Sequence, residues 1–255
     1  MQCHSDEYTA MLDLFYKSID TIVLRDVELL LKLRLLRDLL RHSLSHDSFR
    51  IGLVQAVLNT MFGAASQDIW RAPPIFINKH LKYSIRVIFW PAFYDNHPHQ
   101  HNTWSITGVL YNALTVNIYR LVKQDRLKRE RTIAAIAHDA GYLMPGAIHN
   151  ISNRSHAISS SLHIFNHLDG TSQEKNETTW LISSRHHDLS NGIFERACIS
   201  CLLILQDIKT TEAYNMINDI YEHAPWPIKW VAIKALYLFD RGHANDCLNK
   251  LAAIL

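Results

Sequence analysis

The chain has 255 residues, and its 26 lysines and arginines nearly balance 24 aspartates and glutamates, giving a formal net charge of +2. Positive and negative charges that are so nearly balanced give no reason to expect binding to nucleic acid or to an anionic membrane surface. Hydrophobic residues make up 48% of the chain, enough for a substantial buried core, and no stretch approaches the ~20 consecutive apolar residues of a membrane span.

The first part of the chain has the pattern of amphipathic helices. In Val27–Leu40 leucines recur every three or four residues with arginine and lysine between them, so one face of a helix is apolar. Asp47 and Ser48 can cap a second helix that runs to Gly63. The sequence therefore predicts an N-terminal helical segment, residues 1–69, that packs on the next part of the chain.

The character of the chain changes at Pro73 and Pro74, after which β-branched and aromatic residues are interrupted by turn residues. Asn112 falls in a tight turn between two of the expected strands. Many short strands at this spacing predict a barrel or a sandwich over residues 70–170. In chain order the expected strands are Tyr83–Trp90, Trp104–Leu110, Leu114–Leu121, Thr132–Ala137, Ala147–Ile151 and Ser161–Phe165.

From Gln173 onward the helical pattern returns. Two helices are expected at Phe194–Ile208 and Glu212–His223, a third has Pro227 in its first turn and ends near Gly242, and a short last helix starts at Asp246. The succession is similar to a pair of α-solenoid repeats, although no period is well marked. The expected fold is α+β: N-terminal helices, a β-barrel, and a solenoid-like helical extension over residues 171–255.

Sixteen histidines are an unusually large share of the chain, and three of them are spaced like metal ligands. Residues two apart in a strand point to the same face, so His99 and His101 can direct both imidazoles at one ion. His97 and His99 have the same spacing, but Pro98 between them suits a loop that enters the strand. His149 is the third candidate, because barrel closure can bring it opposite the first pair. Three neutral imidazoles with open coordination positions indicate a catalytic site for Fe(II), Zn(II), Ni(II) or Cu(II).

These motifs resemble those of the cysteine dioxygenase-like, or thiol dioxygenase-type, branch of the cupins over roughly Trp70 to Asn166. The first motif is matched by the strand that ends in Trp90, by HQH at 99–101, and by VLYNALTVNIY after it, with Asn112 replacing the usual turn glycine.

The general cupin pattern carries a glutamate ligand four or five residues after the second histidine, where this chain has Ser105 and Ile106. A missing carboxylate is typical of the three-histidine thiol dioxygenases. The resemblance therefore implies a cupin double-stranded β-helix barrel in which His99, His101 and His149 hold one Fe(II).

The second motif of that family is a Ser-x-His-x-Tyr relay beside the iron. Ser161 and His163 match it, so the resemblance implies that His163, oriented by Ser161, supports the catalytic centre. Phe165 stands where the tyrosine would be, and Ile106 stands where some members have a crosslinking cysteine. This chain is therefore not expected to be an ordinary cysteine dioxygenase, and Phe165 is expected to seal the pocket against water.

Family members also use an arginine from an earlier strand to pair with the substrate carboxylate, a contact that suits a planar guanidinium. Arg71 is closest by position, and Arg86 is the alternative. Arg86 alternates with Ile85 and Val87 in its strand, so it faces opposite to them. A surface arginine is the alternative interpretation for each.

The resemblance implies a mononuclear non-haem Fe(II) oxygenase that uses O2 on a small thiol or amino-acid-like substrate. Two other functions stay open. One is a three-histidine cupin oxygenase or oxidase that acts on a non-thiol amino acid or secondary metabolite, which the lost tyrosine favours. The other is a non-catalytic interaction protein whose C-terminal helices contact a partner. A monomer or a homodimer fits either case.

The remaining motifs are assigned structural roles. Cys198 and Cys201 have redox or metal-ligand spacing but lie in an apolar helical run without a second pair, so buried structural cysteines are expected. His186 and His187 are expected at a helix end, and the basic run over residues 119–131 is expected to be a solvated connection between strands. The few scattered cysteines and the lack of a secretory pattern at the N-terminus favour a reducing cytoplasm.

Overall fold

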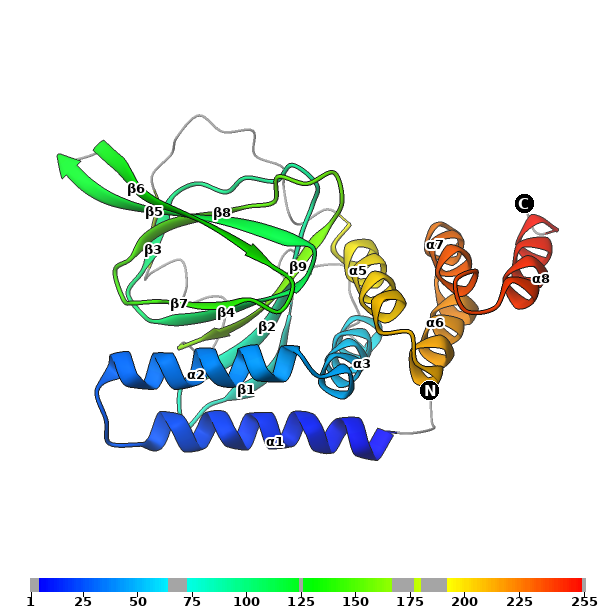
Figure 1. Cartoon of the computed structure of the whole chain (residues 1–255), viewed down its shortest axis with the longest axis horizontal. Coiled ribbons are helices and arrows are strands. Elements are labelled where there is room, and N and C mark those ends of the chain that lie inside the picture. Colours follow the sequence, from blue (N-terminus) through cyan, green and yellow to red (C-terminus); the bar gives the residue numbers. More distant parts are fainter. Residues whose placement is uncertain (1–4, 64–72, 124–125, 167–176, 180–191, 254–255) are drawn as a thin grey trace.

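The computed structural model describes residues 5–63, 73–123, 126–166, 177–179 and 192–253. Helices come first, two facing antiparallel sheets follow, and helices close the described chain (Figure 1). This is the expected α+β class, a cupin-type barrel with helices on both sides of it in the sequence. The N-terminal helices are α1 (Ser5–Leu24), α2 (Leu29–Leu44) and α3 (Asp47–Gly63).

Each sheet of the barrel has five strands and antiparallel pairing throughout. In spatial order the first sheet consists of β1 (Pro74–Asn78), β2 (Tyr83–Trp90), β9 (Ser159–Phe165), β4 (Ser105–Tyr111) and β7 (Ala140–Leu143). The second consists of β10 (Glu177–Thr179), β3 (His99–His101), β8 (Ile148–Ser152), β5 (Ala113–Lys123) and β6 (Arg126–Ile136).

The two faces of the first sheet have different partners, as the alternation of side chains along β2 shows. Ile85, Val87 and Phe89 belong to the large core that the sheet shares with the helices. Ile88 and Trp90 instead contact a small apolar cluster inside the barrel. The period of two along the strand therefore places Arg86 on the interior face, opposite to Ile85 and Val87.

Helix α2 lies against the outer face of the first sheet (Figure 1). Leu40 and Leu44 on its apolar stripe are fully buried. They come so close to β4 that a Cβ at Gly108 would lie only 2.5 Å from Cδ1 of Leu44 and 2.8 Å from Cδ2 of Leu40. Glycine at this position permits the contact between helix and sheet.

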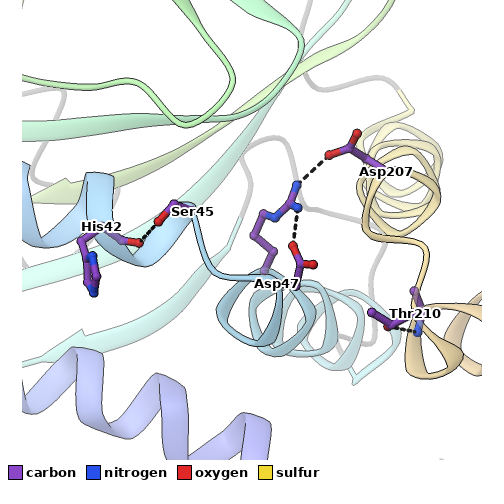
Figure 2. Close-up of polar contacts among 7 residues, drawn as sticks. His42, Ser45, Asp47, Asp207 and Thr210 are labelled. Carbon is purple, nitrogen blue, oxygen red and sulfur yellow. Dashed lines mark hydrogen bonds and ion pairs between the residues drawn. The ribbon is translucent and has the colours of Figure 1, made fainter.

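Arg50 links the N-terminal helices to the C-terminal ones. Its guanidinium, 7% exposed, forms ion pairs with Asp47 in the first turn of α3 (2.5 Å) and with Asp207 of α5 (Ile193–Ile208) at 2.8 Å. Figure 2 shows the two carboxylates approaching from the two helices. A buried guanidinium needs such partners, since its desolvation is otherwise uncompensated.

The C-terminal helices pack in succession to one side of the barrel (Figure 1). Side chains cap the first turn of two of them: Thr210 accepts from the backbone N–H of Ala213, and Asp240 accepts from that of His243. The sequence also predicted two helices here, but it ended the first near Gly242 and began the second at Asp246, whereas the cap at Asp240 starts the last helix at Arg241. After α5 the helices are α6 (Thr211–His223), α7 (Trp226–Leu236) and α8 (Arg241–Ala252). Among the described residues, no helix is both long and apolar enough to cross a bilayer.

The basic run at residues 119–131 is mostly strand, whereas the sequence predicted a connection. Strands β5 and β6 pair with each other as far as Lys123 and Arg126, beyond Tyr119, where the pairing of β5 with β8 ends. Exposure of the run to solvent agrees with the prediction. Asn112 occupies the tight turn before β5 with φ of +63°, and its side-chain amide donates to Ser155 Oγ at 2.6 Å.

Candidate metal centre

Three histidine side chains converge inside the barrel, on two neighbouring strands of the second sheet. His99 and His101 occupy the two ends of β3, and His149 lies directly opposite His99 on β8. One ring nitrogen from each lies within 4.8 Å of one from each of the other two. Among the described residues no aspartate, glutamate or cysteine joins this group. The geometry therefore provides the three-imidazole donor set that the spacing predicts.

Backbone hydrogen bonds fix the orientation of two of these rings. Nδ1 of His99 lies 2.9 Å from the carbonyl oxygen of His97, and Nδ1 of His149 lies 3.1 Å from that of Ala147. A carbonyl oxygen only accepts, so each Nδ1 carries the proton and each Nε2 presents its lone pair. Metal-binding histidines commonly have this arrangement, in which the second nitrogen donates to a carbonyl. The residues present fit a divalent metal ion.

Burial favours the neutral form of the His149 imidazole, the form that binds a metal ion. His149 is 2% exposed, and its burial, followed by the neighbouring His99 and His101, holds its pKa well below the usual range. The hydrogen bond to Ala147 acts in the opposite direction, since it favours the charged ring.

A chain of four hydrogen-bonded side chains extends across the first sheet beside the histidines. Trp90 Nε1 lies 2.7 Å from Ser161 Oγ, Ser161 Oγ lies 2.7 Å from His163 Nε2, and His163 Nδ1 lies 3.0 Å from Thr107 Oγ1. The pairing of Ser161 with His163 agrees with the relay that the second motif predicts.

The direction of this chain follows from its first member. An indole N–H can only donate, so Ser161 Oγ accepts from Trp90. The hydroxyl hydrogen of Ser161 is then satisfied by His163 Nε2, which leaves the imidazole proton on Nδ1, donating to Thr107. Complete burial, followed by the charge of His101, lowers the pKa of His163 to about 3, so the ring is neutral.

Phe165 lies between this relay and the metal ligands. Its ring stacks on His163, with centroids 5.2 Å apart and planes at 11°, and meets His101 edge-on at 6.1 Å. The side chain is 6% exposed. The position is therefore filled by an apolar ring that excludes water, without the hydroxyl that a tyrosine would bring.

The two candidate arginines have different outcomes. Arg71 lies outside the described residues, so its assignment stays a prediction. Arg86 is 8% exposed and is the cross-strand neighbour of His163 in the first sheet. The order β2–β9–β4 places Arg86 on one side of His163 and Thr107 on the other.

The other motifs have the structural roles expected of them or lie outside the described residues. Cys198 and Cys201 are buried, free thiols of α5, and burial raises the pKa of both, which makes them poor nucleophiles. His186 and His187 lie outside the described residues.

Sequence reasoning missed the part that Thr107 takes in the site and left Trp90 as a pocket or core aromatic. A signal for Thr107 was present, since it alternates with Ile106 in β4 and so faces the interior when Ile106 faces the helices. The hydrogen bond of Trp90 to Ser161 joins residues 71 positions apart in the sequence, and no local pattern marks it.

Comparison with known proteins gives only weak similarity. No protein-family model and no curated protein matches the chain. Among solved structures, an oxalate oxidase in complex with the substrate analogue glycolate is 19% identical over 39% of this chain and 46% of its own, with a TM-score of 0.31. The alignment thus spans less than half of that relative's length.

Two further structures have a similar level of likeness. A cupin superfamily protein from Desulfitobacterium hafniense is 10% identical over 39% of this chain and 77% of its own, with a TM-score of 0.30. Oxalate decarboxylase from Bacillus subtilis is 17% identical over 38% of this chain and 24% of its own, also with a TM-score of 0.30. Scores this low carry no argument about activity, and the site is interpreted from its own geometry.

Proposed function

We propose that this chain is a mononuclear non-haem Fe(II) oxygenase of the thiol dioxygenase type, acting with O2 on a small thiol or amino-acid-like substrate. The observation that carries the proposal is the convergence of His99, His101 and His149 with two Nε2 lone pairs directed inward and no carboxylate among the described residues. Histidine donors alone do not select iron over zinc, nickel or copper, and the choice of Fe(II) rests on the resemblance of the motifs.

Iron bound there would supply a redox-active centre that orients substrate and O2. The chain itself determines what surrounds that centre. Ser161 donates to Nε2 of His163, so the ring is neutral with its proton on Nδ1. His163 therefore places no charged imidazolium beside the three histidines. Phe165 keeps water away from the same region. We assign Arg86 to the carboxylate of the substrate, because its interior position beside His163 suits that contact.

A second candidate function is favoured by one feature of the site. Because Phe165 has no hydroxyl, the site lacks the group that the family resemblance places near a bound thiol and oxygen. A three-histidine oxygenase or oxidase acting on a non-thiol amino acid or secondary metabolite fits this difference. Both candidates need the same metal centre, and the substrate distinguishes them.

The test is O2 consumption by protein loaded anaerobically with Fe(II). The substrates are cysteine, cysteamine, 3-mercaptopropionate and thiol-free amino acids, and the product is examined for sulfinate. The Zn(II)-loaded protein serves as the control, since zinc fills the site without redox activity. Uptake matched to sulfinate with one thiol supports the first candidate, and uptake with a thiol-free compound supports the second. If the protein binds iron tightly but consumes O2 with none of these compounds, the result contradicts the proposal for these substrates.

A further inference from the structure

The barrel contains a cavity of about 550 Å³ to one side of the histidines. It lies between β4 and β7 of the first sheet and β5, β6 and β8 of the second. Its wall includes Thr107, which bonds to His163, and Ala147, whose carbonyl holds His149. Ile118, the cross-strand neighbour of His149, also lines it. The cavity therefore begins one residue away from the candidate metal centre.

The middle of the cavity is apolar. Val109, Leu114, Val116, Ile133 and Ile151 line it, and three of these belong to the small apolar cluster inside the barrel. A volume of this size is usual for sites that hold ligands much larger than a free amino acid. Water in such a space has few polar partners, so an apolar group that displaces it gains free energy.

Space in the cavity is also evident at Gly141 on β7. This glycine is the cross-strand neighbour of Thr107, so a side chain there would point into the barrel. A Cβ built on it meets no atom within 4 Å. A Cβ at this position would therefore meet no wall of the cavity, and a larger side chain would extend from it into the cavity.

Charged side chains also line the cavity. They are Arg37, Arg41, Arg131 and Asp139. Arg131 belongs to the edge strand β6 and is the cross-strand neighbour of Ile118. Arg37 is engaged by Asp38 at 2.7 Å, and Arg41 lies 4.0 Å from Asp139. Arg131 is exposed on this edge strand and forms no ion pair with any other described residue, so its guanidinium can bind an anion from solution.

We infer that this cavity takes the apolar body of the substrate, an aliphatic or aromatic group, and that Arg131, at the β6 edge of the cavity, binds an anionic group of the same molecule. The inference rests on the proposed function for the reaction that occurs at the inner end. Arg86 lies on the far side of His163 from the cavity, so the two arginines serve opposite ends of the ligand.

Straight-chain carboxylates of four to ten carbons are the probes, titrated by calorimetry into the iron-loaded protein under anaerobic conditions. Each methylene that enters the cavity should tighten binding about three- to fourfold. Alcohols of the same length should bind several-fold more weakly, because they bring no charge to Arg131. Affinity that does not depend on chain length would overturn the assignment of an apolar body.

Two variants with matched controls locate the bound molecule. Arg131→Gln should lower the affinity for the carboxylates about fivefold and leave the affinity for the alcohols unchanged. Arg129→Gln removes the same charge from the same strand on the outer face, where Arg129 pairs with Tyr119, and should have no effect. Gly141→Phe should abolish binding of the long carboxylates. Gly63→Phe, at the end of α3 where an added Cβ also meets no atom, should not.

The metal content of each variant separates this inference from the proposed function. If the protein takes up no iron but binds carboxylates with an affinity that rises with chain length, the result supports the cavity assignment and contradicts the metal centre. Stoichiometric iron with equal affinity in wild type and Gly141→Phe contradicts the cavity assignment alone. Arg131→Gln changes only an exposed side chain, so its result stands even if Gly141→Phe fails to fold.

Discussion

Ser161 holds together the hydrogen-bond chain beside the candidate metal centre, and its replacement by alanine tests that arrangement. Ser161 is fully buried, Trp90 is 3% exposed and His163 is 2% exposed. Without the hydroxyl, the indole N–H of Trp90 loses its acceptor and His163 Nε2 loses its donor. The substitution removes a single oxygen atom, so it creates little space for repacking.

The expected cost follows from these two lost partners. A buried polar group left without a partner costs about 1–3 kcal/mol, so Ser161→Ala should destabilise the protein by about 2–6 kcal/mol. Urea unfolding of metal-free protein, followed by circular dichroism, measures the change in the free energy of unfolding. Tryptophan fluorescence should shift as well, because the N–H of Trp90 no longer has its bond.

The neighbouring Ser160 provides a matched control. It lies on the same strand and is equally buried, but its hydroxyl has no hydrogen-bond partner within the part of the chain that is described. Ser160→Ala should therefore leave stability unchanged or raise it slightly, since a buried unpaired hydroxyl is removed. If Ser161→Ala proves no more costly than Ser160→Ala, the directed hydrogen-bond chain is wrong.

Two further predictions concern charge. His163 has a pKa of about 3 when folded and about 6.5 when unfolded. The unfolded chain therefore binds more protons below pH 6.5. His163 alone should remove about 2 kcal/mol of stability from metal-free protein between pH 7.5 and pH 5, and the lowered pKa of His149 acts in the same direction, so urea unfolding at each pH should show a loss of at least this size. Asp207→Ala removes one partner of the buried Arg50 and should cost about 1 kcal/mol. Asp38→Ala, in an exposed pair, should cost almost nothing, and equal costs would contradict the assigned role of Arg50.

Two members of the three-histidine group could be predicted to share one face because the information is local. The period of two places His99 and His101 on one face of a strand whatever its register is. His149 needed a further assumption, that the barrel closes with its strand beside theirs, and the pairing of His149 with His99 supports it. The same local rule predicted that Arg86 faces opposite to Ile85 and Val87, but not that this face is the interior of the barrel.

The parts that the sequence could not predict depend on register between distant strands or on competition between local signals. The bonds from Trp90 to Ser161 and from Thr107 to His163 cross between strands that are far apart in the sequence. In the basic run 119–131, repulsion between like charges argues against strand pairing. The ladder between β5 and β6 forms nevertheless, extending the pairing that starts at their apolar ends.

Binding of one iron ion by His99, His101 and His149 can be measured as the iron content of the purified chain after anaerobic loading with Fe(II). The wild type should bind one iron per chain, and replacing any of the three by alanine should abolish stoichiometric binding while circular dichroism retains the helical signal. His156→Ala, which removes an exposed imidazole elsewhere, should leave the iron content unchanged. Stoichiometric iron retained in His99→Ala or His149→Ala would contradict the assignment.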